Sequence, residues 1–124
     1  PPPPAASPEQ DRQALHLLRV MIAAANADGA IDAAERETIL GNARDAGLDA
    51  ADVAALDAEF AAPLSLPQLL ARTPPALCEE AYVAALVGIT ADTEAETRFL
   101  AELADGLGLD AAARQRIREQ VGLA

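Results

Sequence analysis

Three carboxylates surround a glycine in the segment 27–35, ADGAIDAAE, and their spacing is compatible with a cation site. Asp28, Asp32 and Glu35 fall within eight positions, with Gly29 between the first two. Carboxylate oxygens are the ligands that Ca²⁺ and Mg²⁺ prefer, whereas Zn²⁺ favours nitrogen and sulfur. The segment lacks the repeated aspartates and the twelve-residue loop of an EF-hand. We therefore expect any cation held here to bind weakly.

A second acidic turn follows at Asp92 and Glu96. Local helix physics does not explain Asp92, which only precedes a cap. Nor does it explain Asp28, which stands near the end of a helix, where the macrodipole disfavours an anion. Two helical halves that pack with their turns adjacent would bring five carboxylates together. The candidate ligands of such a shared Ca²⁺ or Mg²⁺ site are Asp28, Asp32, Glu35, Asp92 and Glu96.

Helix capping gives several of the same residues a purely structural role. Asp32 with Glu35, and Thr93 with Glu96, have the spacing of a capping box, in which the two side chains bond each other's backbone N–H groups. The cation interpretation and the capping interpretation both remain open from the sequence. No cofactor other than Ca²⁺ or Mg²⁺ is indicated.

The remaining reactive side chains lack the partners that catalysis or metal binding needs. Cys78 is the only cysteine, so it forms no internal disulfide, and we expect a buried, inert thiol. His16, without a second histidine, is expected to be partly exposed on a helix. Arg114, Arg116 and Arg118 are expected to complement the dipole of the last helix. No nucleophile, phosphate-loop or cofactor motif is present, so we predict a protein that is not an enzyme.

Composition restricts the fold and the partners. The 124 residues suffice for one domain, and with 52% hydrophobic but only 2% aromatic residues the core requires closely packed helices. The net charge of −11 repels nucleic-acid backbones and suits cations and basic protein surfaces. The longest apolar run, 81–89, is shorter than the roughly 20 residues that cross a bilayer. We expect a monomer or a weak dimer, whose membrane contact lies only in a region outside this chain.

Caps, glycines and prolines divide the chain into helices. Residues 1–8, PPPPAASP, are interpreted as a proline-rich linker within a longer protein, and residues 9–124 as a single all-α domain. Ser7 is the expected cap of the first helix, which should end near Gly29. The other helices are expected at 32–47, 49–63, 65–70, 76–90 and 93–108, and from 110 onward. No segment has the alternation of a strand.

The two halves of the chain resemble each other. Gly47-Leu48-Asp49 matches Gly108-Leu109-Asp110 at an offset of 61 residues, and the same offset pairs Met21 with Tyr82. A helix, an acidic turn, a helix and a Gly-Leu-Asp step thus occur twice. We predict a compact all-α bundle of about seven helices, built from two similar halves.

These motifs are similar to those of a known superfamily. The segments LLRVMIAAANADGAIDAAERETILGNARDAGLD and YVAALVGITADTEAETRFLAELADGLGLD resemble the TerB-like superfamily, named for tellurite resistance. Within it, the chain is most similar to the domain of unknown function 533 family, over roughly residues 12–122. The most specific element is the Asp-Gly-x-x-Asp-x-x-Glu turn.

The resemblance implies an all-α fold of about seven helices. It also implies attachment to a Gly/Ala-rich, membrane-associated region, at the cytoplasmic side of a bacterial inner membrane or in the cytoplasm. TerB-like domains are suspected of binding divalent cations through the acidic turns, which here correspond to Asp28, Asp32, Glu35, Asp92 and Glu96. Thr90 stands where the family often has an acidic residue.

We therefore expect a non-enzymatic module of a larger protein that acts in protein interaction or regulation. Its partner protein is not identified by the sequence, and an apolar groove is expected near Phe60, Leu64 and Leu66. The alternative function is a domain that binds Ca²⁺ or Mg²⁺ through its two acidic turns.

Overall fold

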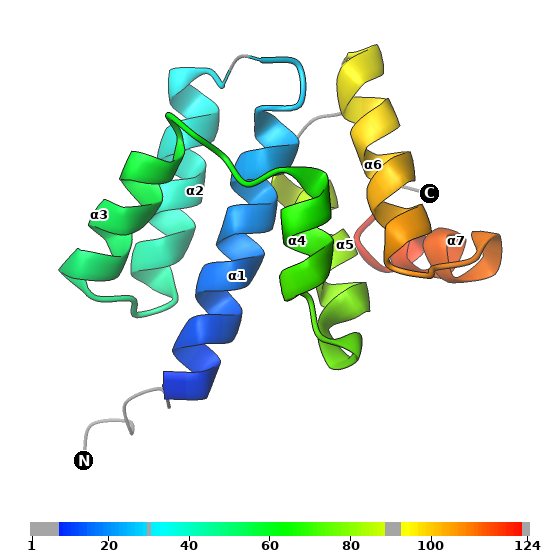
Figure 1. Cartoon of the computed structure of the whole chain (residues 1–124), viewed down its shortest axis with the longest axis horizontal. Helices are drawn as coiled ribbons and strands as arrows, with labels where there is room; N and C mark the ends of the chain where they lie inside the picture. Colours follow the sequence, from blue (N-terminus) through cyan, green and yellow to red (C-terminus); the bar gives the residue numbers. More distant parts are fainter. Residues whose placement is uncertain (1–7, 30, 89–92, 123–124) are drawn as a thin grey trace.

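Helices account for all the regular structure in the described part of the chain. The computed structural model describes residues 8–29, 31–88 and 93–122, and within these ranges there is no strand, as expected. Figure 1 shows the elements in order. They are α1 (Pro8–Ala25), α2 (Ala33–Asp45), α3 (Ala50–Glu59), α4 (Leu66–Arg72), the 3₁₀ turn η1 (Pro75–Leu77), α5 (Cys78–Gly88), α6 (Glu94–Gly106) and α7 (Ala111–Gln120).

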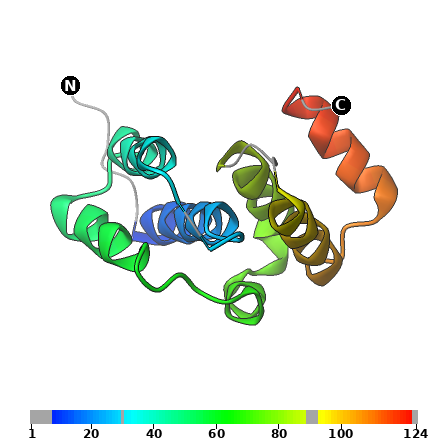
Figure 2. The same cartoon turned by 90° about the horizontal axis from the view of Figure 1, so that it is seen from above.

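The helix α1 lies at the centre of the molecule. It packs most extensively against α5 and also contacts α2, α3, α4 and α6 (Figure 2). Its last six residues are completely enclosed, because residues 20–25 (VMIAAA) are all buried. Three consecutive alanines leave room for neighbouring backbones to approach closely, which is how a core with few aromatic rings reaches normal density.

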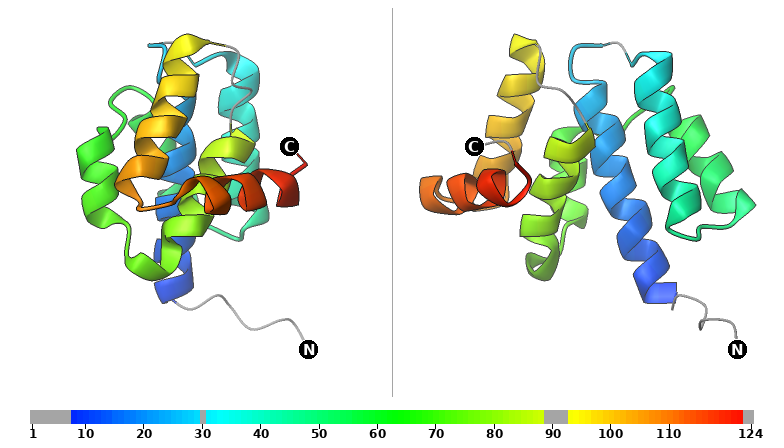
Figure 3. Two further views of the ribbon diagram at one scale, coloured as in Figure 1. Left: turned by 90° about the vertical axis from the view of Figure 1, so that its right-hand side faces the viewer. Right: turned by 180° about the vertical axis from the view of Figure 1, so that it is seen from behind.

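The two halves of the chain occupy the two sides of the bundle. The helices α1, α2 and α3 lie on one side, and α5, α6 and α7 on the other, with α7 running crosswise to α6 (Figures 1 and 3). The short α4 bridges the halves, since it contacts both α1 and α6. None of the helices in the described ranges is long and apolar enough to cross a membrane.

The repeat seen in the sequence is also present in the backbone. Gly47 and Gly108 have φ values of 82° and 74°, in the left-handed region that glycine enters without strain. The next residue donates to the carbonyl five positions back, at 3.2 Å for Leu48 and 3.0 Å for Leu109. This is the Schellman ending of a helix. Both leucines are buried, so the predicted Gly-Leu-Asp step anchors each half in the same way.

Several predicted boundaries require correction. The first helix ends at Ala25 rather than near Gly29, and the helix expected at 49–63 ends at Glu59 rather than at Pro63. The helix expected from residue 65 to residue 70 runs from Leu66 to Arg72, with Ser65 as its N-cap. The helix expected from residue 76 begins at Cys78, after the 3₁₀ turn that follows two prolines. The predicted cap Ser7 and residues 89–92 lie outside the described ranges.

Candidate functional site

The first acidic turn and the start of α6, which carries Glu96, lie at the same end of the molecule (Figure 1). The helices α2 and α6 both begin there, as two opposite views show (Figures 1 and 3). Asp28 and Asp32 are exposed, Glu35 is half-buried, and Glu96 is only 4% exposed. Asp92 and Thr90 lie outside the described ranges.

Both capping boxes form as the spacing predicts. In the first, Asp32 Oδ1 accepts from the N–H of Glu35 at 2.7 Å, and Glu35 Oε1 accepts from the N–H of Asp32 at 3.2 Å. In the second, Thr93 Oγ1 accepts from the N–H of Glu96 at 3.1 Å. Glu96 Oε1 accepts in return from the N–H of Thr93 at 3.3 Å and from its hydroxyl at 3.1 Å. The capping interpretation is therefore confirmed for these four residues.

The pKa of Glu35 is also affected by Glu96, which belongs to the second turn. Burial raises the pKa of Glu35, and the negative charges of Asp32 and Glu96 raise it further, against the lowering effect of its bond from the Asp32 N–H. The charge of a carboxylate on α6 is therefore felt at the start of α2. Nevertheless, the described ranges contain no group of three or more Asp, Glu, His or Cys side chains that could hold a metal ion. The described carboxylates alone do not make up a cation cage.

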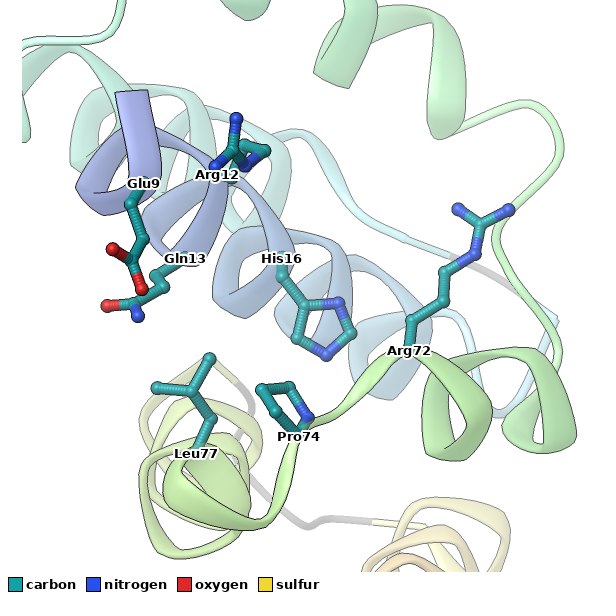
Figure 4. Close-up of a pocket in the computed structure, with 7 residues that line it drawn as sticks. All are labelled: Glu9, Arg12, Gln13, His16, Arg72, Pro74 and Leu77. Carbon is teal, nitrogen blue, oxygen red and sulfur yellow. The ribbon is translucent and has the colours of Figure 1, made fainter. Parts of the chain in front are cut away.

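A second candidate site was not predicted. A cavity of about 290 Å³ lies where α1 meets the end of α4 and the prolines before α5 (Figure 4). The residues that line it are Glu9, Arg12, Gln13, His16, Arg72, Pro74 and Leu77. It combines two arginines, a histidine and a glutamine with an apolar wall, so it can receive a polar group attached to a small apolar body.

His16, expected to be partly exposed, is in fact buried, with 8% of its surface exposed. Its Nε2 lies 2.7 Å from Thr73 Oγ1, and the Thr73 hydroxyl donates to the carbonyl of Leu69 at 2.7 Å. Burial lowers the pKa of His16, and the positive charges of Arg19 and Arg72 lower it further. Sequence spacing gave no sign of this contact, because 57 residues separate the histidine from the threonine.

An apolar groove exists, but not where it was expected. Phe60, Leu64 and Leu66 pack against the core, and the guanidinium of Arg36 lies 5.1 Å from the ring centre of Phe60. A groove of about 440 Å³ lies instead between α2 and α3. It is lined by Leu40, Arg44, Leu48, Ala50, Val53, Ala54 and Asp57.

Two expectations about other side chains were wrong. Cys78 is half-buried rather than buried, with its Sγ 3.8 Å from the carbonyl of Pro74. Arg114 pairs with Asp105 at 2.5 Å, and Arg116 pairs with Glu79 at 3.1 Å. Arg114 and Arg116 therefore tie α7 to neighbouring helices instead of complementing its carboxyl end, whereas Arg118 lies in the last turn of α7, as expected.

Comparisons with known proteins bear on family and fold. The family model described as "Protein of unknown function (DUF533)" matches residues 1–121. A crystal structure of a tellurite resistance protein from Nostoc punctiforme superposes with a TM-score of 0.72. The match covers 90% of this chain and 72% of that one, at 20% sequence identity. No curated protein matches the chain. At this identity the structural match speaks for the fold alone.

Proposed function

We propose, from the premise that this chain belongs to the DUF533 family of proteins of unknown function and has a TerB-like fold, that it acts as a non-enzymatic module for protein interaction. Its partner would contribute a basic, amphipathic helix. The observation that carries the proposal is the apolar groove between α2 and α3, which lies inside a strongly acidic part of the surface.

The lining of the groove suits the apolar face of a helix. Leu40 and Leu48 are buried at its base, Val53 is half-buried, and Ala50 and Ala54 are exposed. Small exposed side chains beside larger buried ones leave a depression that an incoming side chain can fill. An amphipathic helix binds such a groove through apolar residues spaced three and four apart.

The negative charge around the groove favours a basic partner helix. Residues 33–59, which contain both helices, hold seven acidic and two basic side chains. Of the charged residues that line the groove, Arg44 is already paired with Glu37 at 3.0 Å, and Asp57 is paired with Arg36. A partner helix with lysines beside its apolar face would be attracted by the remaining acidic groups, whereas an acidic helix would be repelled.

The test uses two alanine positions on α3. Ala54 lines the groove, whereas Ala55 is exposed on the same helix and does not line it. Binding of a leucine- and lysine-containing amphipathic peptide would be measured by calorimetry with Ala54→Gln, Ala55→Gln and the parent protein. We expect Ala54→Gln to weaken binding about tenfold or more, and Ala55→Gln to bind as the parent does. Equal binding by both variants, or equal binding of a glutamate version of the peptide, would overturn the proposal.

A second candidate, weak Ca²⁺ or Mg²⁺ binding at the acidic turns, is favoured by the repulsion that Glu35 experiences from Asp32 and Glu96. A cation beside these carboxylates would relieve that repulsion. Titration of each cation would be followed by amide chemical shifts, with Asp32→Asn compared with the parent. Shifts confined to the starts of α2 and α6, and reduced in the variant, support this function. Unchanged shifts at millimolar cation exclude it.

A further inference from the structure

The arginines of this acidic protein differ in whether they form ion pairs. Six of the nine form ion pairs in the structure, namely Arg19, Arg36, Arg44, Arg98, Arg114 and Arg116. Within the described ranges, Arg12 and Arg72 have neither an ion pair nor a hydrogen bond. Both line the cavity that holds His16 (Figure 4). Two arginines without ion pairs, against the single carboxylate of Glu9, leave a local excess of positive charge at this cavity.

The hydrogen bonds of His16 determine its tautomer. The Thr73 hydroxyl has a single proton, which it donates to the carbonyl of Leu69. His16 Nε2 must therefore carry the proton of its own bond to Thr73 Oγ1. Nδ1 is left as the basic nitrogen of the ring, and it has no hydrogen-bond partner among the described residues. The lining of the cavity thus combines a proton acceptor with two permanently charged arginine side chains.

We propose that this cavity binds the carboxylate of a small aliphatic monoanion, and that His16 Nδ1 takes up one proton from solvent when the anion enters. Arg12 and Arg72 are exposed, flexible side chains, and the guanidinium group matches a carboxylate with two parallel hydrogen bonds. Pro74 and Leu77 would contact the aliphatic part of the ligand. The site lies apart from the α2–α3 groove, and the two proposals are independent.

Charge and size restrict the ligand to a small monoanion. Glu9 also lines the cavity, and the whole chain carries −11, so each further negative charge on a ligand adds repulsion. A phosphate dianion is disfavoured for this reason. A cavity of about 290 Å³ is slightly smaller than the usual ligand-binding pocket of about 300–1,000 Å³. An acid of the size of valerate fits this volume.

The charges around His16 determine whether anion binding raises or lowers its pKa. Glu9 and Arg12 lie on the same helix, Arg72 lies on α4, and Arg19 is paired at 2.9 Å with Glu59 of α3. The turn η1 brings no charged residue. In the empty cavity, burial holds the pKa of His16 below its usual value, and the positive charges of Arg19 and Arg72 lower it further. Of these two arginines only Arg72 lines the cavity, and a carboxylate bound there offsets its charge, so the pKa of the imidazolium rises.

The single histidine makes the test direct, since its ring gives one set of NMR signals. The pKa of His16 would be measured in valerate, in valeramide, which has a similar shape but no charge, and in chloride at equal ionic strength. We expect the pKa to rise in valerate alone, and valerate to bind more tightly as the pH falls. Linkage requires that a rise of one pKa unit corresponds to a tenfold difference in affinity between the two protonation states.

Two arginine variants separate a site from general charge attraction. Arg72→Gln removes a cavity charge, whereas Arg98→Gln removes an exposed arginine of α6 that lies outside this cavity. We expect the valerate-induced change in the His16 pKa to fall at least about threefold in Arg72→Gln and to be unchanged in Arg98→Gln. The proposal is overturned by an equal pKa in valerate and valeramide, by equal effects of the two variants, or by tighter binding of phosphate than of valerate.

Discussion

At the scale of one residue, Glu35 caps a helix although its surroundings disfavour its negative charge. Burial and the charges of Asp32 and Glu96 raise its pKa. A raised pKa in the folded state gives stability that is fully present below the unfolded value, about 4.3, and is lost as the pH rises through the folded value. Glutamine can cap the same N–H without the charge. We expect Glu35→Gln to increase the free energy of unfolding at pH 7, by at most about 1 kcal/mol at this half-exposed position.

Urea unfolding at pH 7 and near pH 3.5 measures this effect. The gain from Glu35→Gln should vanish at the lower pH, where the glutamate itself is protonated. Glu102→Gln, an exposed carboxylate of α6, is the matched control and should show no such dependence. A loss of stability in Glu35→Gln at pH 7 would mean that the carboxylate does more than cap the helix. Repeating the measurement with a chelator would then show whether a cation is involved.

The caps could be predicted from sequence because their atoms are three residues apart, within one turn of chain. Asp32 and Glu35 needed no knowledge of the rest of the fold. The burial of His16 depends instead on Thr73, which reaches it only after α4 has packed against α1. A single helical histidine in an apolar segment carries no local sign of such a partner.

At the scale of elements, the duplicated helix endings should respond alike to the same substitution. An alanine at Gly47 or Gly108 meets no atom within 4 Å, so the cost comes only from a positive φ. We expect Gly47→Ala and Gly108→Ala each to lower the free energy of unfolding by about 1–2 kcal/mol. Gly41 lies inside α2 with equal space around it. There, alanine should raise the free energy of unfolding by about 0.5–1 kcal/mol.

Thermal and urea unfolding of the three variants compare these effects directly. A stable Gly47→Ala protein would mean that the end of α2 can relax out of the left-handed conformation. Unequal effects at Gly47 and Gly108 would show that the two halves repeat in shape but not in stability. The glycines and the offset of 61 residues were sufficient to predict both helix endings. The 3₁₀ turn before α5 was missed, since tertiary packing decides how a chain leaves a pair of prolines.

At the scale of the whole molecule, the sequence predicted two similar halves but not that α1 of one half packs against α5 of the other. The patterns of α1 and α5 show that both are apolar, yet periodicity does not say which apolar helix faces which. The structure brings them together at Gly88, where an added Cβ would lie 2.9 Å from Met21 Cβ and 3.3 Å from its Cα. The junction therefore depends on a missing side chain, a feature that no hydrophobic pattern records.

Gly88→Ala should accordingly weaken the junction between the halves. The nearest atom is the Met21 Cβ, and the Met21 Cα lies at 3.3 Å; both remain whatever residue other than glycine stands at position 21, so the helices must move apart even if the Met21 Cγ, at 3.0 Å, rotates away. We expect a loss of about 1–3 kcal/mol in the free energy of unfolding. Met21→Ala should not restore it, because alanine retains the Cβ.

Gly106 supplies the control, since it ends α6 as Gly88 ends α5. The three atoms nearest to its added Cβ are the two methyl carbons and Cγ of the Leu70 side chain, which can rotate away. Gly106→Ala should therefore cost less than Gly88→Ala in urea unfolding. If the two variants lose equal stability, or if Met21→Ala rescues Gly88→Ala, side-chain packing rather than backbone approach limits the contact between α1 and α5. The two halves would then be joined less rigidly than their close approach implies.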